Sequence, residues 1–291
     1  MPAEPFLGAE ALAAGRLNRH QLRTRFGIVF PGVYLDRSVG PALGSRITAA
    51  WLWSRRRAVV GGLAASALHG AKWVPADATI ELISDNTHPP AGIRCHDDTL
   101  GDGETCLVRG IPVTTPERTA FDIARRGALD AAIARLDALM NATGVKLADI
   151  EELAARHRHT RGLRQLETVL LLADAGAQSP RETALRLLLI RAGLTGLQTQ
   201  IEVFDGDGEF VARVDMGWRE LLIAVEYDGE QHRTDRRQYI RDVRRLEALD
   251  RLGWVVIRVV KEDRPADIIR RVRDAQAESW ALRRKPGRKF G

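Results

Sequence analysis

The segment that most constrains this chain is an apolar strand that ends in carboxylates. Residues 223–225 form a run typical of a strand inside a sheet, and the run leads directly into Glu226, Tyr227 and Asp228. A charge at the edge of a packed sheet is costly unless it is paired or coordinates an ion. A fold that contains this segment must therefore supply a partner for Glu226 and Asp228.

The elements predicted around this segment alternate in the order αβββαβα. They are helix 179–193, strands 197–205, 209–218 and 220–228, helix 235–252, strand 254–260 and a helix from 266. This order predicts an α/β domain over residues 177–282, followed by a basic tail at 283–291.

The length and composition favour an intracellular protein with several domains. At 291 residues the chain exceeds one typical domain. The formal charge of +6 suits a polyanionic partner such as DNA. Two cysteines indicate a reducing cytoplasm rather than a disulfide scaffold, and no apolar run is long enough to span a membrane.

The N-terminal residues 1–42 predict a small winged helix-turn-helix. Helices are expected over 7–14 and 18–25, and Pro31-Gly32 marks a turn between two short strands. The second helix carries side chains that can meet phosphates or base edges. The predicted DNA-binding residues are Arg19, Gln21, Arg23 and Arg25.

Residues 43–176 predict a mixed region that becomes helical. Strands are expected near residues 80–84 and 93–96, and Thr115 followed by Pro116 is typical of a helix start. From residue 128 onward apolar residues recur at three-to-four spacing, as in packed helices.

Three acidic positions are expected to converge in the C-terminal domain. Asp215 lies near the end of the second strand, and the period of two places Glu226 and Asp228 on one face of the third. Carboxylates of this kind hold Mg²⁺ or Mn²⁺, which activates water for attack on phosphorus. The sequence therefore predicts a metal site at Asp215, Glu226 and Asp228.

Residues 179–273 resemble the PD-(D/E)XK nuclease superfamily, whose restriction-endonuclease-like core has this element order. Asp215 and Glu226 match its two acids, and Asp228 stands where that family has lysine. The segment from VEYDGEQH to DVRRLEALDRLGWVVIRV is similar to domains related to the very-short-patch repair (Vsr-like) endonucleases. The resemblance implies catalytic roles for Asp215, Glu226, Asp228, His232 and Glu182.

The same resemblance implies that Arg241 and Arg245 bind the scissile phosphate. It predicts a metal-dependent DNA endonuclease for repair of mismatched or damaged duplexes or for defence, with a homodimer if both strands are cut. Because the lysine is absent, a second hypothesis is a DNA-binding regulator with a degenerate nuclease domain. RNA as the substrate stays open.

The N-terminal half has its own resemblance. GVYL and IPVTTPERTAFDIA, together with the winged helix, are similar to the AbiEi-type antitoxins over about residues 5–140. These proteins are DNA-binding repressors, so the resemblance implies DNA binding by the second helix.

Several of these residues have structural alternatives. Ser179 to Glu182 form a capping box, in which the glutamate serves the helix end. Asp228-Gly229 can be a hairpin turn, and arginines of helix 235–252 can line a solvated face. A zinc site at Cys95, His96 and Cys106 fits no standard spacing.

Overall fold

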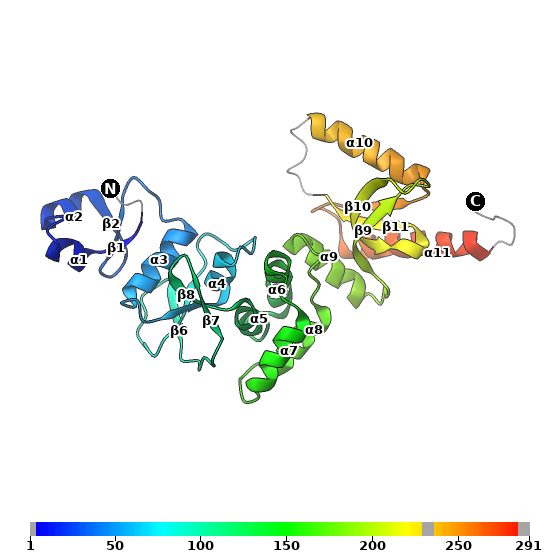
Figure 1. Ribbon diagram of the computed structural model, residues 1–291. Coiled ribbons are helices and arrows are strands. Elements are labelled where there is room, and N and C mark those ends of the chain that lie inside the picture. The colour runs from blue at the N-terminus through cyan, green and yellow to red at the C-terminus, as the bar shows by residue number, and fades with distance from the viewer. Residues whose placement is uncertain (1–3, 229–235, 285–291) are drawn as a thin grey trace. The chain divides into compact units, whose positions relative to one another are not determined.

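The structure is a computed structural model that describes residues 4–228 and 236–284 (Figure 1). Contacts divide the chain into two compact units, Met1–Ala175 and Gly176–Gly291. Both units contain helices and strands, which confirms the mixed α/β class. No helix within the described ranges has the length and apolarity needed to cross a bilayer. The further division at residue 42 stays a prediction.

The first unit begins with two short helices and a β-hairpin. The elements are β1 (Phe6–Leu7), α1 (Gly8–Ala13), α2 (Arg19–Arg25), β2 (Phe26–Phe30) and β3 (Val33–Asp36). The strands form an antiparallel sheet in the order β1-β3-β2. Asn18 caps α2, since its side-chain oxygen accepts a hydrogen bond from the Gln21 backbone N–H at 2.8 Å. The helix start is therefore encoded locally.

A five-stranded sheet follows, in the order β6-β5-β4-β8-β7. Its elements and the neighbouring helices are α3 (Leu43–Trp53), β4 (Val59–Gly61), α4 (Gly62–Leu68), β5 (Ile80–Ile83), β6 (Ile93–His96), β7 (Thr105–Val108) and β8 (Ile111–Thr114). Val60, Leu82 and Val113 fill its core together with Ile47 of α3. Strands β5 and β6 were predicted from the sequence, whereas the other three strands of this sheet were not.

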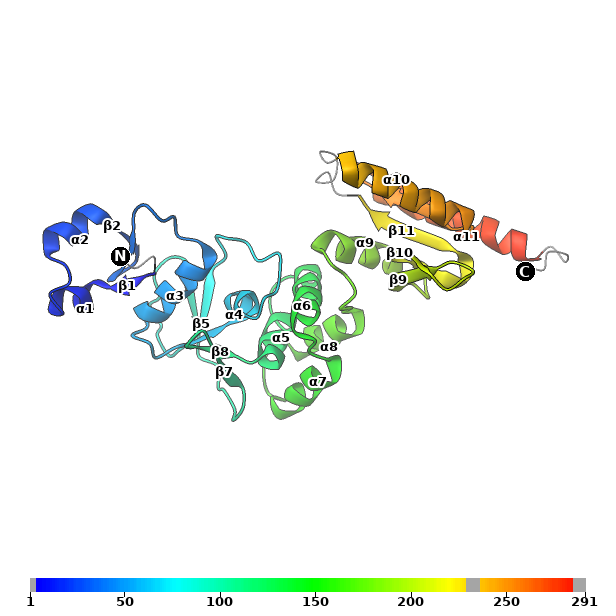
Figure 2. The ribbon, with the colours of Figure 1, turned by 45° about the horizontal axis from the view of Figure 1, so that its top comes forward.

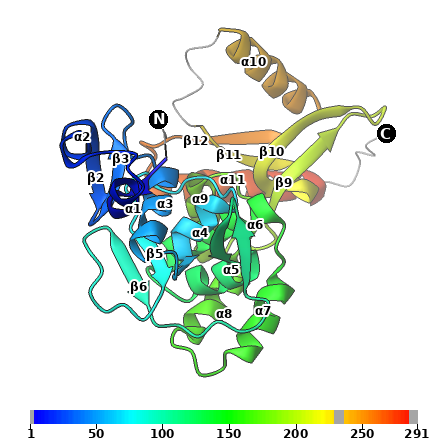
Figure 3. The same ribbon diagram turned by 60° about the vertical axis from the view of Figure 1, so that its left-hand side comes forward.

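Four helices complete the first unit, and α5 lies at their centre (Figure 3). They are α5 (Pro116–Ala124), α6 (Leu129–Thr143), α7 (Leu147–Arg156) and α8 (Leu163–Leu172). Thr115 caps α5 and Pro116 opens it, as predicted. Phe121 is fully buried on α5, which packs against α6, α7 and α8.

The second unit has the predicted order αβββαβα (Figure 2). Its elements are α9 (Pro180–Arg191), β9 (Gln198–Phe204), β10 (Phe210–Trp218), a 3-10 turn (Arg219–Leu221), β11 (Ile223–Tyr227), α10 (Arg236–Arg251), β12 (Val255–Val259) and α11 (Pro265–Arg284). The sheet order is β12-β11-β10-β9, with β11 and β12 parallel.

Helices cover both sides of β11, which explains why its apolar run is continuous. Ile223 and Val225 pack with residues of α9 and α11, whereas Ala224 packs with Leu249 of α10. Residues buried on both faces leave no polar alternation. Glu226 continues the face of Ala224, and therefore points to the side of α10.

Candidate functional site

The exposed side of α2 is the candidate nucleic-acid interface. Arg19, Arg23 and Arg25 are exposed, while Leu22 packs inward. Arg19 and Arg23 are one helical turn apart and so lie on the same side. The first turn of α2 contains no acidic residue. This side can therefore offer guanidinium donors to a phosphate backbone.

Gln21 has a capping role that the sequence analysis did not assign. Its side-chain oxygen accepts a hydrogen bond from the Asn18 backbone N–H at 2.9 Å. Its own backbone N–H donates to Asn18, so the two residues form a reciprocal box. DNA binding by Gln21 stays a prediction, and its oxygen is already engaged in the helix cap.

The β-hairpin is held against α2 by Arg37. The Arg37 guanidinium donates to the Arg23 carbonyl oxygen at 3.3 Å. Ile28 on β2 is 68% exposed. The β-hairpin therefore carries an exposed apolar side chain, Ile28, and is followed by a basic side chain, Arg37, that contacts α2.

The charges of Glu182 and Glu226 act on Asp215 in the second unit, whereas Asp228, the third acid predicted to converge there, pairs with Arg258. Met216 pairs with Val225, so Asp215 and Glu226 are the next residues of the β10–β11 ladder and share a face. The Tyr227 N–H donates to Asp215 at 3.1 Å. Burial, and then the negative charges of Glu182 and Glu226, raise the pKa of Asp215 to about 7.

Arginines are the partners that the charged end of β11 requires. Arg245 of α10 donates to both oxygens of Glu226, at 2.6 and 2.8 Å. Asp228 forms a hydrogen-bonded ion pair with Arg258 on the neighbouring strand β12. A bidentate arginine–carboxylate pair of this type neutralises a buried carboxylate without a metal ion. The structure therefore places Arg245 on Glu226, where the sequence analysis assigned it to a phosphate.

Glu182 has the capping role that was set out as its alternative. Its carboxylate accepts from the Gln178 N–H at 2.8 Å and from the Ser179 hydroxyl at 2.9 Å. The Ser179 hydroxyl in turn accepts from the Glu182 N–H at 3.2 Å. The Glu182 charge still reaches Asp215, as the raised pKa of Asp215 indicates.

The described acids do not fit a magnesium ion in this arrangement. Both Glu226 oxygens are occupied by Arg245, and Asp228 is held by Arg258. Within residues 4–228 and 236–284, no group of three or more acidic, histidine or cysteine side chains is placed to hold a metal. Arg241 is exposed on α10. His232 lies outside the described residues.

The raised pKa of Asp215 predicts that ionisation of this one carboxyl destabilises the unit as the pH rises. An unfolded aspartate ionises near pH 3.8, whereas folded Asp215 ionises at about 7. The contribution of Asp215 to stability is therefore most favourable below pH 3.8 and falls until the pH passes about 7. At pH 8 we expect Asp215→Asn to raise the free energy of unfolding by about 2–4 kcal/mol.

Urea unfolding at pH 4 and at pH 8 measures this effect, with exposed Asp250→Asn on α10 as the matched control. The increase in the free energy of unfolding caused by Asp215→Asn should vanish at pH 4. An equal gain at both values, or none at either, would contradict the assignment.

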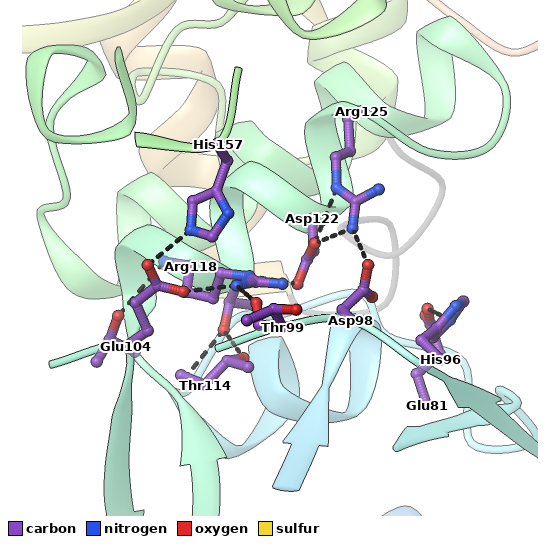
Figure 4. A network of polar contacts seen from close by, with 12 residues as sticks. Glu81, His96, Asp98, Thr99, Glu104, Thr114, Arg118, Asp122, Arg125 and His157 are labelled. Carbon is purple, nitrogen blue, oxygen red and sulfur yellow. Dashed lines mark hydrogen bonds and ion pairs between the residues drawn. The ribbon is translucent and has the colours of Figure 1, made fainter. Parts of the chain in front are cut away.

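A buried ionic network in the first unit was not found by sequence analysis (Figure 4). At its centre Arg118 of α5 is only 1% exposed. It donates to Glu104 at 2.5 Å and to Asp122 at 3.0 Å. His157, the residue directly after α7, lies 2.7 Å from the other Glu104 oxygen. The network therefore connects Glu104, which directly precedes β7, to helices α5 and α7.

The network favours the ionised form of Glu104. Burial opposes ionisation of Glu104, but the bonds from His157 and Arg118 outweigh it and hold the Glu104 pKa below its ordinary value. Asp122 also accepts from Arg125, at 2.7 and 2.9 Å. Arg118 and Asp122 are four residues apart in a segment otherwise typical of an amphipathic helix, and this spacing was the one available signal.

The cysteines take no part in a metal site within the described residues. Cys95 and Cys106 are free thiols, and His96 is hydrogen-bonded to Glu81 at 2.9 Å.

Comparisons with known proteins agree with the antitoxin resemblance in the first unit. The chain is 31% identical over 156 residues to two uncharacterized proteins of Mycobacterium tuberculosis, one from strain CDC 1551 and one from strain H37Rv. These matches cover 54% of this chain and 57% of each relative, so the chain spans little more than half their length. No solved structure matches the chain significantly. Residues 58–172, which contain the buried network, match the AbiEi antitoxin C-terminal domain family.

Proposed function

We propose that this protein is a DNA-binding regulator similar to the AbiEi-type antitoxins. The observation that carries the proposal is the exposed helix α2, which presents Arg19, Arg23 and Arg25 beside a β-hairpin. A helix-turn-helix places its second helix in the major groove, where such side chains reach phosphates and base edges. The match of residues 58–172 to an antitoxin domain supports this reading independently.

The second unit serves in this proposal as a nuclease-like scaffold. Its element order is that expected of the PD-(D/E)XK core, but Arg245 and Arg258 neutralise two of the three predicted metal ligands. A buried carboxylate that is fully paired with arginine is stable without a cation. This arrangement supports a degenerate site.

The direct test is selection of bound sequences from a pool of random duplexes with the full chain. We expect one enriched sequence, with affinity that falls steeply as salt rises, because phosphate contacts release counterions. Recovery of an unenriched pool would contradict regulation by specific binding.

A second candidate function is hydrolysis of DNA by the second unit. The pKa of Asp215 favours it, because burial and then the negative charges of Glu182 and Glu226 raise that pKa, and a cation would offset those charges. For Mg²⁺ or Mn²⁺ to bind there, Arg245 would have to leave Glu226.

Substitution of Arg245 separates the two candidates. Arg245→Ala leaves Glu226, which is 7% exposed, without its bidentate partner. We expect a loss of about 1–3 kcal/mol in the free energy of unfolding, and no cleavage of plasmid or mismatched duplex by either protein with Mg²⁺ or Mn²⁺. Exposed Arg244→Ala on the same helix is the control. Cleavage that appears in the presence of these ions, and is abolished by Asp215→Ala, would establish the second candidate.

A further inference from the structure

A cavity of about 350 Å³ in the first unit is lined by a concentration of arginines. It opens where strands β5 and β6 meet the end of α5 and the start of α8, next to the buried network. Its arginines are Arg94, Arg125, Arg126, Arg135 and Arg161. A volume of this size is sufficient for a small ligand.

Positive charge in this cavity exceeds the negative charge around it. Asp98 and Asp122 accept hydrogen bonds from Arg125, and Asp98 also pairs with Arg126. Figure 4 shows Arg125 directed at both carboxylates, with Glu81 and His96 to one side. Against the five arginines of the lining, Glu81, Asp98 and Asp122 leave an excess of two positive charges. The excess matches a dianion.

The arginines at the rim supply that excess. Arg94, Arg135 and Arg161 are exposed. Their guanidinium groups make no ion pair or hydrogen bond within the described residues, whereas Arg125 and Arg126 are paired with Asp98. Arginines fixed by a carboxylate and arginines free to move, around one cavity, can bind an anion from several directions.

Backbone N–H groups at the cavity point to the same ligand class. Gly162 lines it and is the N-cap of the ten-residue helix α8, with no side chain capping the helix. A Cβ at Gly162 would lie 2.3 Å from the Arg125 carbonyl oxygen. Only glycine therefore allows the start of α8 to lie this close to the backbone of Arg125. Uncapped N–H groups at a helix start favour phosphate.

We propose that this cavity binds the phosphate groups of a small phosphorylated ligand. A phosphomonoester or diphosphate carries about two or more negative charges, with oxygens that accept bidentate bonds from arginine. No Phe, Tyr or Trp side chain lines the cavity, and the His96 ring that lines it is hydrogen-bonded to Glu81, so the site lacks the large aromatic platform on which a base would stack. Recognition is therefore of the phosphates, whether they belong to a nucleotide or to another phosphorylated metabolite.

Calorimetric titration of the full chain tests the proposal with inorganic pyrophosphate, a purine nucleoside triphosphate and a pyrimidine nucleoside triphosphate. Wild type should bind all three, and the double variant Arg135→Ala/Arg161→Ala should bind them at least about tenfold more weakly. Tighter binding of the nucleotides than of pyrophosphate would identify the ligand as a nucleotide. Equal binding of all three would show that the site recognises the phosphates alone. Arg164→Ala, an exposed arginine on α8 outside the cavity, should bind as wild type does.

Three results would overturn the proposal. They are no binding of any probe at millimolar concentration, equal binding by wild type and the double variant, or an equal response to sulfate at matched ionic strength. A double variant that loses duplex affinity while retaining pyrophosphate binding would assign these arginines to a DNA surface instead. Since the side chains replaced are exposed, unchanged thermal unfolding of the double variant shows that the fold is intact.

Discussion

Arg118→Met should lower the free energy of unfolding of the first unit by about 3–5 kcal/mol. Methionine keeps most of the volume but leaves Glu104 and Asp122 as buried charges, each 1–2% exposed, with part of their hydrogen bonding lost. The carbonyl of Thr99, which accepts from Arg118 at 2.9 Å, also loses its donor. Uncompensated burial of charge is the costliest of these effects. Urea unfolding followed by circular dichroism measures the loss.

Glu104→Gln keeps the experiment informative if Arg118→Met does not fold. The amide retains the shape and one acceptor, so we expect a smaller loss of about 1–3 kcal/mol. Exposed Arg164→Ala, in the same unit, controls for removal of a surface arginine and should change stability by less than about 0.5 kcal/mol. If both network variants match this control, the network does not stabilise the fold.

Replacing Arg19, Arg23 and Arg25 together by alanine should weaken binding to the selected duplex at least about 100-fold. These guanidinium groups are exposed, so their loss removes DNA contacts without removing core packing. Alanine is also the best helix former, and the Asn18–Gln21 box that starts α2 is untouched. Fluorescence anisotropy with the labelled duplex measures the change.

The matched control removes the same charge elsewhere in the first unit. Arg109, Arg156 and Arg164 are all exposed, and their triple alanine variant has the same net charge as the α2 variant. The affinity of this control variant for the duplex should fall by less than about tenfold, because only the general electrostatic attraction to DNA is weakened. Equal losses in the two variants would show that overall charge, and not α2, binds DNA.

Sequence patterns predicted the elements whose signals are local. Asn18 before α2 and Thr115-Pro116 before α5 mark helix starts through bonds to residues three positions away. The order αβββαβα could likewise be read from periodicity and turns. The strands β4, β7 and β8 were missed; they have three or four residues each, but β5 and β6, which were predicted, have only four, so strand length alone does not explain the difference.

The partners of buried charges could not be predicted, because they come from distant parts of the chain. Glu104 is bound by Arg118 and His157, which lie 14 and 53 residues away. The need for a partner at Glu226 was evident from the sequence, but the choice between a cation and Arg245 depends on how α10 packs. Spacing along the chain does not encode that packing, so a metal site at these acids stays a prediction.

The salt dependence of DNA binding tests the central claim, that α2 holds the duplex through its arginines. The logarithm of the association constant should fall linearly with the logarithm of salt concentration, and the slope of the α2 triple variant should be shallower than that of wild type by about 2–3 units. Identical slopes for wild type and the α2 variant would contradict phosphate contacts by Arg19, Arg23 and Arg25, and with them the proposed mode of DNA binding.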